Sequence, residues 1–171
     1  MITTKQTSKE YFREGKIVFY ALAVSQLFFG LIAFLLVYSK TIAPPEPALQ
    51  NSILIIVTLF AAGGFVGSNF VFNRKLKALK TKLELKERMA DYRSALMIRY
   101  ALLEAPVMLA IILYFLTCDI LFLGLAALIV AFFLTLTPTR ERAIKDLELS
   151  NKEQEQINDP NAVIAEISTI V

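Results

Sequence analysis

Four long apolar stretches, separated by polar segments, fill most of this chain of 171 residues. A helix needs about 20 consecutive apolar residues to cross the hydrocarbon core of a bilayer. The pattern therefore predicts an all-α membrane protein whose core is a four-helix transmembrane bundle with cytoplasmic helical extensions. The expected spans are residues 17–37, 52–72, 96–116 and 120–136, and the fourth is short enough to run with little tilt. They form a membrane domain over residues 17–136, between an N-terminal segment, 1–16, and a C-terminal segment, 137–171.

Composition supports this class of protein and excludes several others. Hydrophobic residues make up 56% of the chain, and the mean hydropathy is +0.58. A soluble domain of this length has too small an interior for that much apolar surface. The chain has no His, so His-based metal sites and Ser-His or Cys-His catalysis are excluded. Its single cysteine, Cys118, has no intrachain partner for a disulfide. We expect no catalytic residue, no metal and no cofactor.

The distribution of Lys and Arg predicts the orientation. Basic residues gather in the N-terminal segment, in the central segment 73–99 and in the C-terminal tail. The first outer connection, 38–51, carries only Lys40, and the third connection, 117–119, carries none. By the positive-inside rule, both termini and the central segment are expected in the cytoplasm.

Two pairs of short stretches suggest an internal duplication. Residues 19–22 match residues 99–102 at the start of the odd-numbered spans, and residues 77–80 match residues 142–145 after the even-numbered ones. Each half would then be a helical hairpin, and the two hairpins would be parallel tandem copies about an axis along the membrane normal. The alternative is coincidence among apolar residues.

The central segment predicts a cytoplasmic basic helix over residues 73–95. It lacks Pro and Gly and is rich in Lys, Leu and Glu, which favour helix. An apolar stripe recurs along it at helical spacing, at Leu76, Leu79, Leu83 and Ala90. The other faces are basic, and we expect anionic lipid headgroups to bind there, at Lys75, Lys77, Lys80 and Lys82.

The segment behind the fourth span, 139–150, is the expected partner of the basic helix. It and the residues after it carry acidic side chains that would complement the basic charges, at Glu141, Asp146, Glu148, Glu153 and Glu155. Beyond Ser150 a flexible tail is expected, in which Asp159 and Pro160 end any helix.

Glu104 is an acid predicted to lie inside a span. An ionisable side chain at membrane depth is costly and is by default a functional hypothesis. At 1.5 Å per residue, Gln26 of the first span lies at a similar depth, with Ser25 beside it. We predict an intramembrane polar layer of these three side chains, with Glu104 buried and largely neutral. One interpretation is a structural hydrogen bond between Glu104 and Gln26; the other is ion or proton handling.

Small residues in the second span predict close helix packing. Gly63 and Gly67 form a G-x-x-x-G face, and Gly64 and Ser68 repeat the spacing. Such faces let two backbones approach closely. The span 52–72 is therefore predicted to be a central packing helix.

Pro106 predicts a kink in the third span. Proline removes one backbone hydrogen bond and bends a helix. The carbonyl of Leu102, one turn earlier, loses its helical donor. A polar group of the predicted layer would satisfy it.

The residues from Tyr92 to Leu96 and from Arg99 to Pro106 are similar to a segment of four-span membrane proteins of bacteria, chiefly the Bacteroidota. This resemblance is best over the third and fourth spans. It implies a multi-pass protein of the bacterial inner membrane and brings no known activity with it.

Together these patterns predict a small non-enzymatic integral membrane protein. It would act as an oligomer or as an accessory subunit of a membrane complex, with lipids and membrane proteins rather than nucleic acid as partners. The alternative is a small transporter or proton-coupled channel that uses Glu104.

Overall fold

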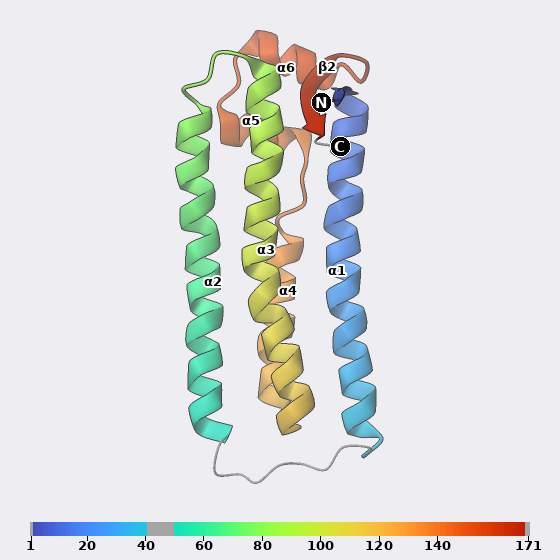
Figure 1. Ribbon diagram of the computed structural model, residues 1–171, viewed down its shortest axis with the longest axis vertical. Helices are drawn as coiled ribbons and strands as arrows, with labels where there is room; N and C mark the ends of the chain where they lie inside the picture. The colour runs from blue at the N-terminus through green and yellow to red at the C-terminus, as the bar shows by residue number, and fades with distance from the viewer. Residues whose placement is uncertain (1, 41–49, 170–171) are drawn as a thin grey trace. The chain divides into compact units, whose positions relative to one another are not determined.

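The computed structural model of this chain describes residues 2–40 and 50–169. Six helices and a two-stranded sheet lie within these residues (Figure 1). In chain order the elements are β1 (Ile2–Thr7), α1 (Ser8–Tyr38), α2 (Gln50–Leu79), α3 (Leu85–Thr117), α4 (Ile120–Leu134), α5 (Arg140–Leu147), α6 (Asn151–Asn158) and β2 (Val163–Thr169). The predicted helical class is confirmed, and the sheet is an addition to it.

Three of the helices, α1, α2 and α3, are long and apolar enough to cross a membrane. Helix α4 is apolar as well but has only 15 residues, because the chain turns at Thr135. At 1.5 Å per residue it is about 22 Å long, against a hydrocarbon core of about 30 Å. The chain is thus a helical membrane protein with three long apolar helices and a shorter fourth one.

The described chain divides into two compact units, each assembled from separate parts of the sequence. The polar unit comprises residues 1–19, 70–99 and 137–171, and the apolar unit comprises residues 20–69 and 100–136. The polar unit contains the sheet, α5, α6 and the hydrophilic ends of α1, α2 and α3. The apolar unit contains the remainder of these three helices together with α4.

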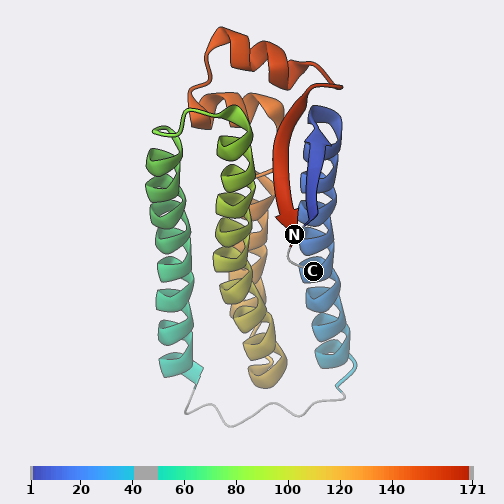
Figure 2. The same ribbon diagram turned by 45° about the horizontal axis from the view of Figure 1, so that its top comes forward.

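Helix α3 is the central helix of the apolar unit, where it lies between α1 and α2 (Figures 1 and 2). Its most apolar stretch is 44% buried, against 17% for α1 and 22% for α2. Its inward face, which includes Leu103, Val107 and Ala110, is fully buried. The prediction that the second span is the central packing helix is therefore wrong, because α3 has neighbours on more of its faces.

The two ends of the described chain meet in the polar unit as an antiparallel ladder. β1 pairs with β2, with Lys5 opposite Glu166 and a register shift at Gln6 (Figure 2). Ile164 and Ala165 of β2 are fully buried. The prediction of a flexible tail beyond Ser150 is wrong at this place. A two-stranded ladder is marginal alone, and the burial of β2 supplies the additional stabilisation.

The predicted continuous helix over 73–95 is also wrong, because the chain reverses within it. Helix α2 ends at Leu79 and α3 begins at Leu85, and the turn is closed by the amide of Lys82, which donates to the Leu79 carbonyl. Leu79 is buried, but Leu83 in the turn is 97% exposed and does not continue the apolar stripe. The reversal lets the buried faces of α2 and α3 lie in one unit, and tertiary packing outweighs helix propensity here.

Of the two pairs of stretches that suggest a duplication, the first lies in long helices in both copies, α1 and α3, whereas the second is not matched in secondary structure. Residues 77–80 include the last turn of α2, whereas residues 142–145 lie in α5, a separate short helix. Pro138 and the N-cap Thr139, whose hydroxyl accepts a hydrogen bond from the Arg142 amide, separate α5 from α4. The tandem hairpins thus stay a prediction.

Candidate functional site

Gln26 is the most deeply buried member of the predicted polar layer. Its side chain is 1% exposed, and neither amide atom has a hydrogen-bond partner among the described residues. The expected bond between Gln26 and Glu104 is therefore not formed. Ser25 does not join the layer either, because its hydroxyl donates to the Leu22 carbonyl of the same helix at 2.8 Å. A buried amide without a partner costs on the order of 1–3 kcal/mol.

Glu104 is half-buried rather than buried. Its neighbours Leu103 and Val107, both 0% exposed, occupy the inward face of α3. One residue advances a helix by about 100°. Glu104 therefore lies beside the inward face and not on it, and the prediction that it is buried is wrong. The structure does not join Glu104, Gln26 and Ser25 into one hydrogen-bonded site.

An apolar cavity of about 260 Å³ lies beside Gln26 in the apolar unit. It is lined by residues of α1, α3 and α4, among them Gly30, Ile111 and Leu123. A Cβ atom placed on Gly30 would lie 3.8 Å from side-chain atoms of both Ile111 and Leu123, which is ordinary contact. Gln26 is the one polar residue among the cavity's described lining.

The closest helix contact measured at a glycine joins α2 to α3 at Gly64. A Cβ atom on Gly64 would lie 2.9 Å from Pro106 Cγ and 3.0 Å from the Leu102 carbonyl oxygen. The Gly64 Cα hydrogen that occupies this Cβ position points at the Leu102 carbonyl oxygen. Pro106 has no N–H, so this carbonyl receives no helical hydrogen bond from it. Ser68, one turn on, is fully buried, and α3 continues as a helix through Pro106. The predicted Gly64–Ser68 face is thus a packing face.

The G-x-x-x-G face of the same helix is different. A Cβ atom on Gly63 or on Gly67 would meet no atom within 4 Å. The prediction that these two glycines pack within the chain is wrong, because Gly64 and Ser68 take the side of α2 that meets α3. The Gly63–Gly67 face is open.

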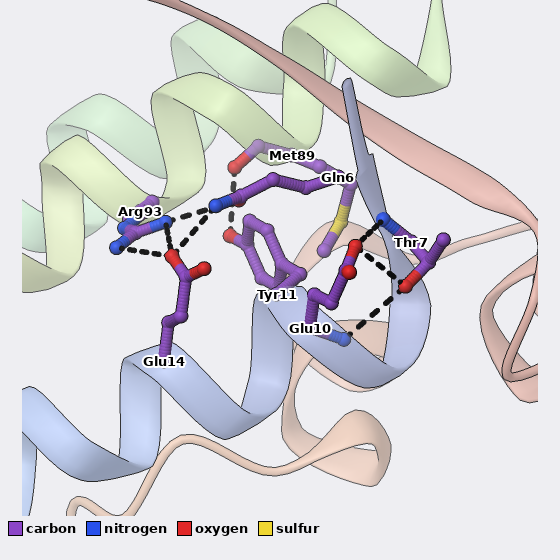
Figure 3. A network of polar contacts seen from close by, with 7 residues as sticks. All are labelled: Gln6, Thr7, Glu10, Tyr11, Glu14, Met89 and Arg93. Carbon is purple, nitrogen blue, oxygen red and sulfur yellow. Dashed lines mark hydrogen bonds and ion pairs between the residues drawn. The ribbon is translucent and has the colours of Figure 1, made fainter. Parts of the chain in front are cut away.

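In the polar unit, Arg93 of α3 forms hydrogen bonds with side chains of β1 and of α1 (Figure 3). Its guanidinium donates to Gln6 Oε1 at 3.0 Å and to Glu14 Oε2 at 3.2 and 3.3 Å. Gln6 in turn donates to the same Glu14 oxygen at 2.6 Å. Beside them, the Tyr11 hydroxyl donates to the Met89 carbonyl at 2.7 Å. These bonds link β1 and the first turns of α1 to α3.

Arg88 of α3 holds the C-terminal helices. It is 7% exposed and donates to Glu153 Oε1 of α6 at 2.8 Å and to the carbonyl of Leu147, at the end of α5. A guanidinium at the C-terminus of a helix interacts favourably with the helix dipole. The Tyr92 hydroxyl donates to Asp146 of α5 at 2.8 Å. Two successive turns of α3 thus contact both short helices.

Opposite charges join the central basic segment to the acidic C-terminal segment, as the sequence predicts. Lys80 lies 2.7 Å from Glu148, and Lys86 lies 2.7 Å from Glu166. Lys82 pairs instead within its own hairpin, with Asp91 at 2.7 Å. Two of the four lysines expected to meet lipid headgroups, Lys80 and Lys82, are thus engaged by carboxylates. Lys75 is half-buried and Lys77 is exposed.

Several pKa values in the polar unit follow from these contacts. Burial, and then the Asp146 carboxylate, raise the pKa of Tyr92, so this hydroxyl stays a neutral donor. Burial alone would raise the pKa of Glu153, but hydrogen bonds from Ser150 and the Arg88 guanidinium lower it. The hydrogen bond and charge of Lys86 lower the pKa of Glu166.

Sequence reasoning missed two capping boxes that position this network. Thr7 and Glu10 exchange hydrogen bonds at the start of α1, and Ser150 and Glu153 form a capping box at the start of α6. Both follow the pattern of Ser or Thr followed three residues later by Glu, which is readable in a sequence. The role of Arg88 could not be predicted from a sequence pattern, because a count of charged residues does not separate a buried arginine from an exposed one.

Fold and contacts define the class of this protein: a helical membrane protein with a hydrogen-bonded polar unit built from both ends of the chain. The chain matches no protein-family model, no curated protein and no solved structure. Its function is therefore argued from the residues described above.

Proposed function

We propose that this chain is a four-span, non-enzymatic membrane protein that acts by association through its transmembrane helices. Its partner would be another copy of itself or a larger membrane complex of which it is an accessory subunit. The charge distribution supports a cytoplasmic location of both termini, and the resemblance over the third and fourth spans implies the bacterial inner membrane.

The observation that carries this proposal is the open face of α2. Gly63 and Gly67 leave a smooth strip with no atom within 4 Å of either Cβ position. The flanking residues Leu59, Phe60 and Val66 are 67%, 49% and 64% exposed, so large side chains border the strip. Transmembrane helices associate by close packing at such small-residue faces. Gly64 is not part of this open face, because it already contacts α3.

A fourth span completes the proposed topology. Helix α4 is about 8 Å shorter than an average hydrocarbon core, and short spans are accommodated by local thinning of the bilayer. Asp119 caps its start by accepting a hydrogen bond from the Leu121 amide. A polar cap at that end is consistent with a helix that begins at the membrane surface.

The test is a comparison of wild type with the double variant Gly63→Leu/Gly67→Leu, purified from native membranes in mild detergent. Wild type is expected as a defined homo-oligomer or with one stoichiometric second protein, identified by mass spectrometry. The double variant is expected to lose that association without unfolding, because a Cβ atom at either position meets nothing within 4 Å and leucine favours helix over glycine. Monomeric wild type, or association unchanged in the variant, would contradict the proposal.

A small transporter or proton-coupled channel is the second candidate. The cavity beside Gln26 and the unpartnered buried amide favour it, because transport sites place polar groups at membrane depth. Its test is flux into liposomes with wild type and Glu104→Gln. Glutamine keeps the size of the side chain and removes its titration. Flux that persists in Glu104→Gln would exclude a proton-carrying role for Glu104.

A further inference from the structure

An open pocket of about 510 Å³ in the polar unit lies between the first turns of α1 and the start of α5. Four basic side chains line it, and the remaining described lining consists of Phe12, Thr139 and Glu141. The four are Lys9, Arg13, Lys16 and Arg140. Lys9, Arg13 and Lys16 recur at helical spacing on one side of α1, and Arg140 is the first residue of α5.

None of these four cations forms an ion pair with a carboxylate among the described residues. The ion pairs among the described residues include Lys80, Lys82, Lys86, Arg88 and Arg93. They include none of the four pocket residues. Like charges so close together repel one another unless an anion lies among them.

The single acid of the pocket does not neutralise it. The Glu141 carboxylate bonds to its own backbone amide and to the Thr139 hydroxyl, and these bonds lower its pKa. Nearby Lys16 and Arg140 lower it further. Glu141 is thus ionised and committed to capping α5, which leaves four positive side chains against one negative one.

The walls of the pocket are held in place by two contacts between α1 and the chain around the start of α5. A Cβ on Gly15 would lie 3.7 Å from the ring of Pro138, so α1 passes close to the segment that leads into α5. The Arg140 guanidinium lies 5.9 Å from the ring centre of Phe12, which is buried. This cation–π contact and the Gly15–Pro138 approach fix the distance between the two basic walls.

The position of the pocket along α1 identifies its ligand. Lys16 is the last polar residue before the apolar stretch of the first predicted span, and Ile17, directly after it, is 60% exposed. A cation at this position lies at the level of lipid headgroups when α1 crosses the bilayer. An exposed apolar side chain beside a basic pocket suits a ligand with a phosphate and a hydrocarbon part.

We propose that this pocket binds the phosphate of an anionic phospholipid headgroup, with Arg13 and Arg140 as the principal contacts. Guanidinium groups bind phosphate oxygens in pairs of parallel hydrogen bonds, and Lys9 and Lys16 add charge at the rim. The site differs from the predicted lipid site at the end of α2 and in the turn that follows it. There, Lys80 and Lys82 are already engaged by carboxylates.

The test measures binding of short-chain phosphatidylglycerol, below its micelle concentration, to the full-length protein in a non-ionic detergent. No anionic surface is then present to attract basic residues at large. The variant Arg13→Gln/Arg140→Gln is expected to bind roughly thirtyfold more weakly, because each of the two lost cations contributes about fivefold. The matched control Lys145→Gln/Lys152→Gln removes the same charge from two exposed lysines outside the pocket and is expected to bind like wild type.

Inorganic phosphate, tested alone and as a competitor, distinguishes a lipid from a soluble phosphate compound. It is expected to compete weakly; binding as tight as that of the lipid would overturn the lipid assignment. Equal losses in the pocket variant and the control would overturn the pocket, because they would indicate diffuse charge attraction. If Arg13→Gln/Arg140→Gln fails to fold, Lys9→Gln/Lys16→Gln takes its place, since both lysines are exposed.

Discussion

The contact between Gly64 and α3 gives the sharpest prediction for the apolar unit. In Gly64→Ala the new methyl group would lie 2.9 Å from Pro106 Cγ and 3.0 Å from the Leu102 carbonyl oxygen. Ordinary contacts to carbon begin near 3.5 Å, so α2 and α3 must separate by about half an ångström. Neither a proline ring nor a backbone carbonyl can rotate away. Overpacking of this kind costs about 1–3 kcal/mol, and we expect about 2 kcal/mol.

Two control variants on the same helix separate packing from helix propensity. Alanine at Gly63 or at Gly67 gains the same intrinsic helix preference, up to about 1 kcal/mol, and meets no atom within 4 Å. The difference between Gly64→Ala and either control is therefore the packing cost alone. Reversible unfolding in mixed detergent and SDS micelles, at a dilution where each protein is monomeric, measures it. If all three variants changed stability alike, the close contact would play no part in stability.

Three further predictions concern buried polar groups and pH. Arg88→Gln should lower the free energy of unfolding by about 3 kcal/mol, because it leaves Glu153 and the Leu147 carbonyl without their cation. Urea titration of the purified protein measures this change. Gln26→Leu should raise the stability by about 1–2 kcal/mol in the same assay, because it removes an unpartnered buried amide; a loss of stability would show that the amide is satisfied in the membrane. Glu153 and Glu166 have pKa values lowered from 4.5 in the folded protein, so their contribution to stability is full above that pH and is lost as the pH falls through the lowered values. Hydrogen exchange corrected for intrinsic rates should therefore show α6 and β2 opening below about pH 4, and no change there would contradict the assigned ion pairs.

The long helices were predictable because their signal is local and strong. Each expected span lies within or nearly coincides with an observed helix, since an apolar stretch of that length has few other stable forms. The helix reversal before Leu85 was not predictable in this way. Residues 80–84 contain neither Gly nor Pro, and the residues on either side of the turn, Leu79 and Met89, are buried. Such a reversal depends on contacts between helices and not on the residues of the turn.

The ladder between β1 and β2 was missed for a related reason. Each strand is only six or seven residues long, and its partner lies at the other end of the chain. Period-two alternation over so few residues is a weak signal, whereas the Thr7 and Ser150 capping boxes are local and readable. In the polar layer, residue counting predicts a similar depth for Gln26 and Glu104 along their helices, and this stays a prediction. The direction of Glu104 around α3 was not predictable, because it depends on which face of α3 packing has selected.

Charge counting has a limit that the polar unit makes plain. The positive-inside rule adds Lys and Arg residues without regard to their partners, and it treats Arg88 and Arg13 alike. In the structure Arg88 is buried against Glu153, whereas Arg13 is exposed at the basic pocket. Removing a paired cation leaves a carboxylate without its partner, so the cost falls on stability. Removing an unpaired cation relieves repulsion within the pocket, so the cost falls on the affinity for an anion. Substitution of a paired cation such as Arg88 should therefore lower stability, and substitution of an unpaired cation such as Arg13 should lower the affinity for an anion. Both kinds of substitution change the net charge equally.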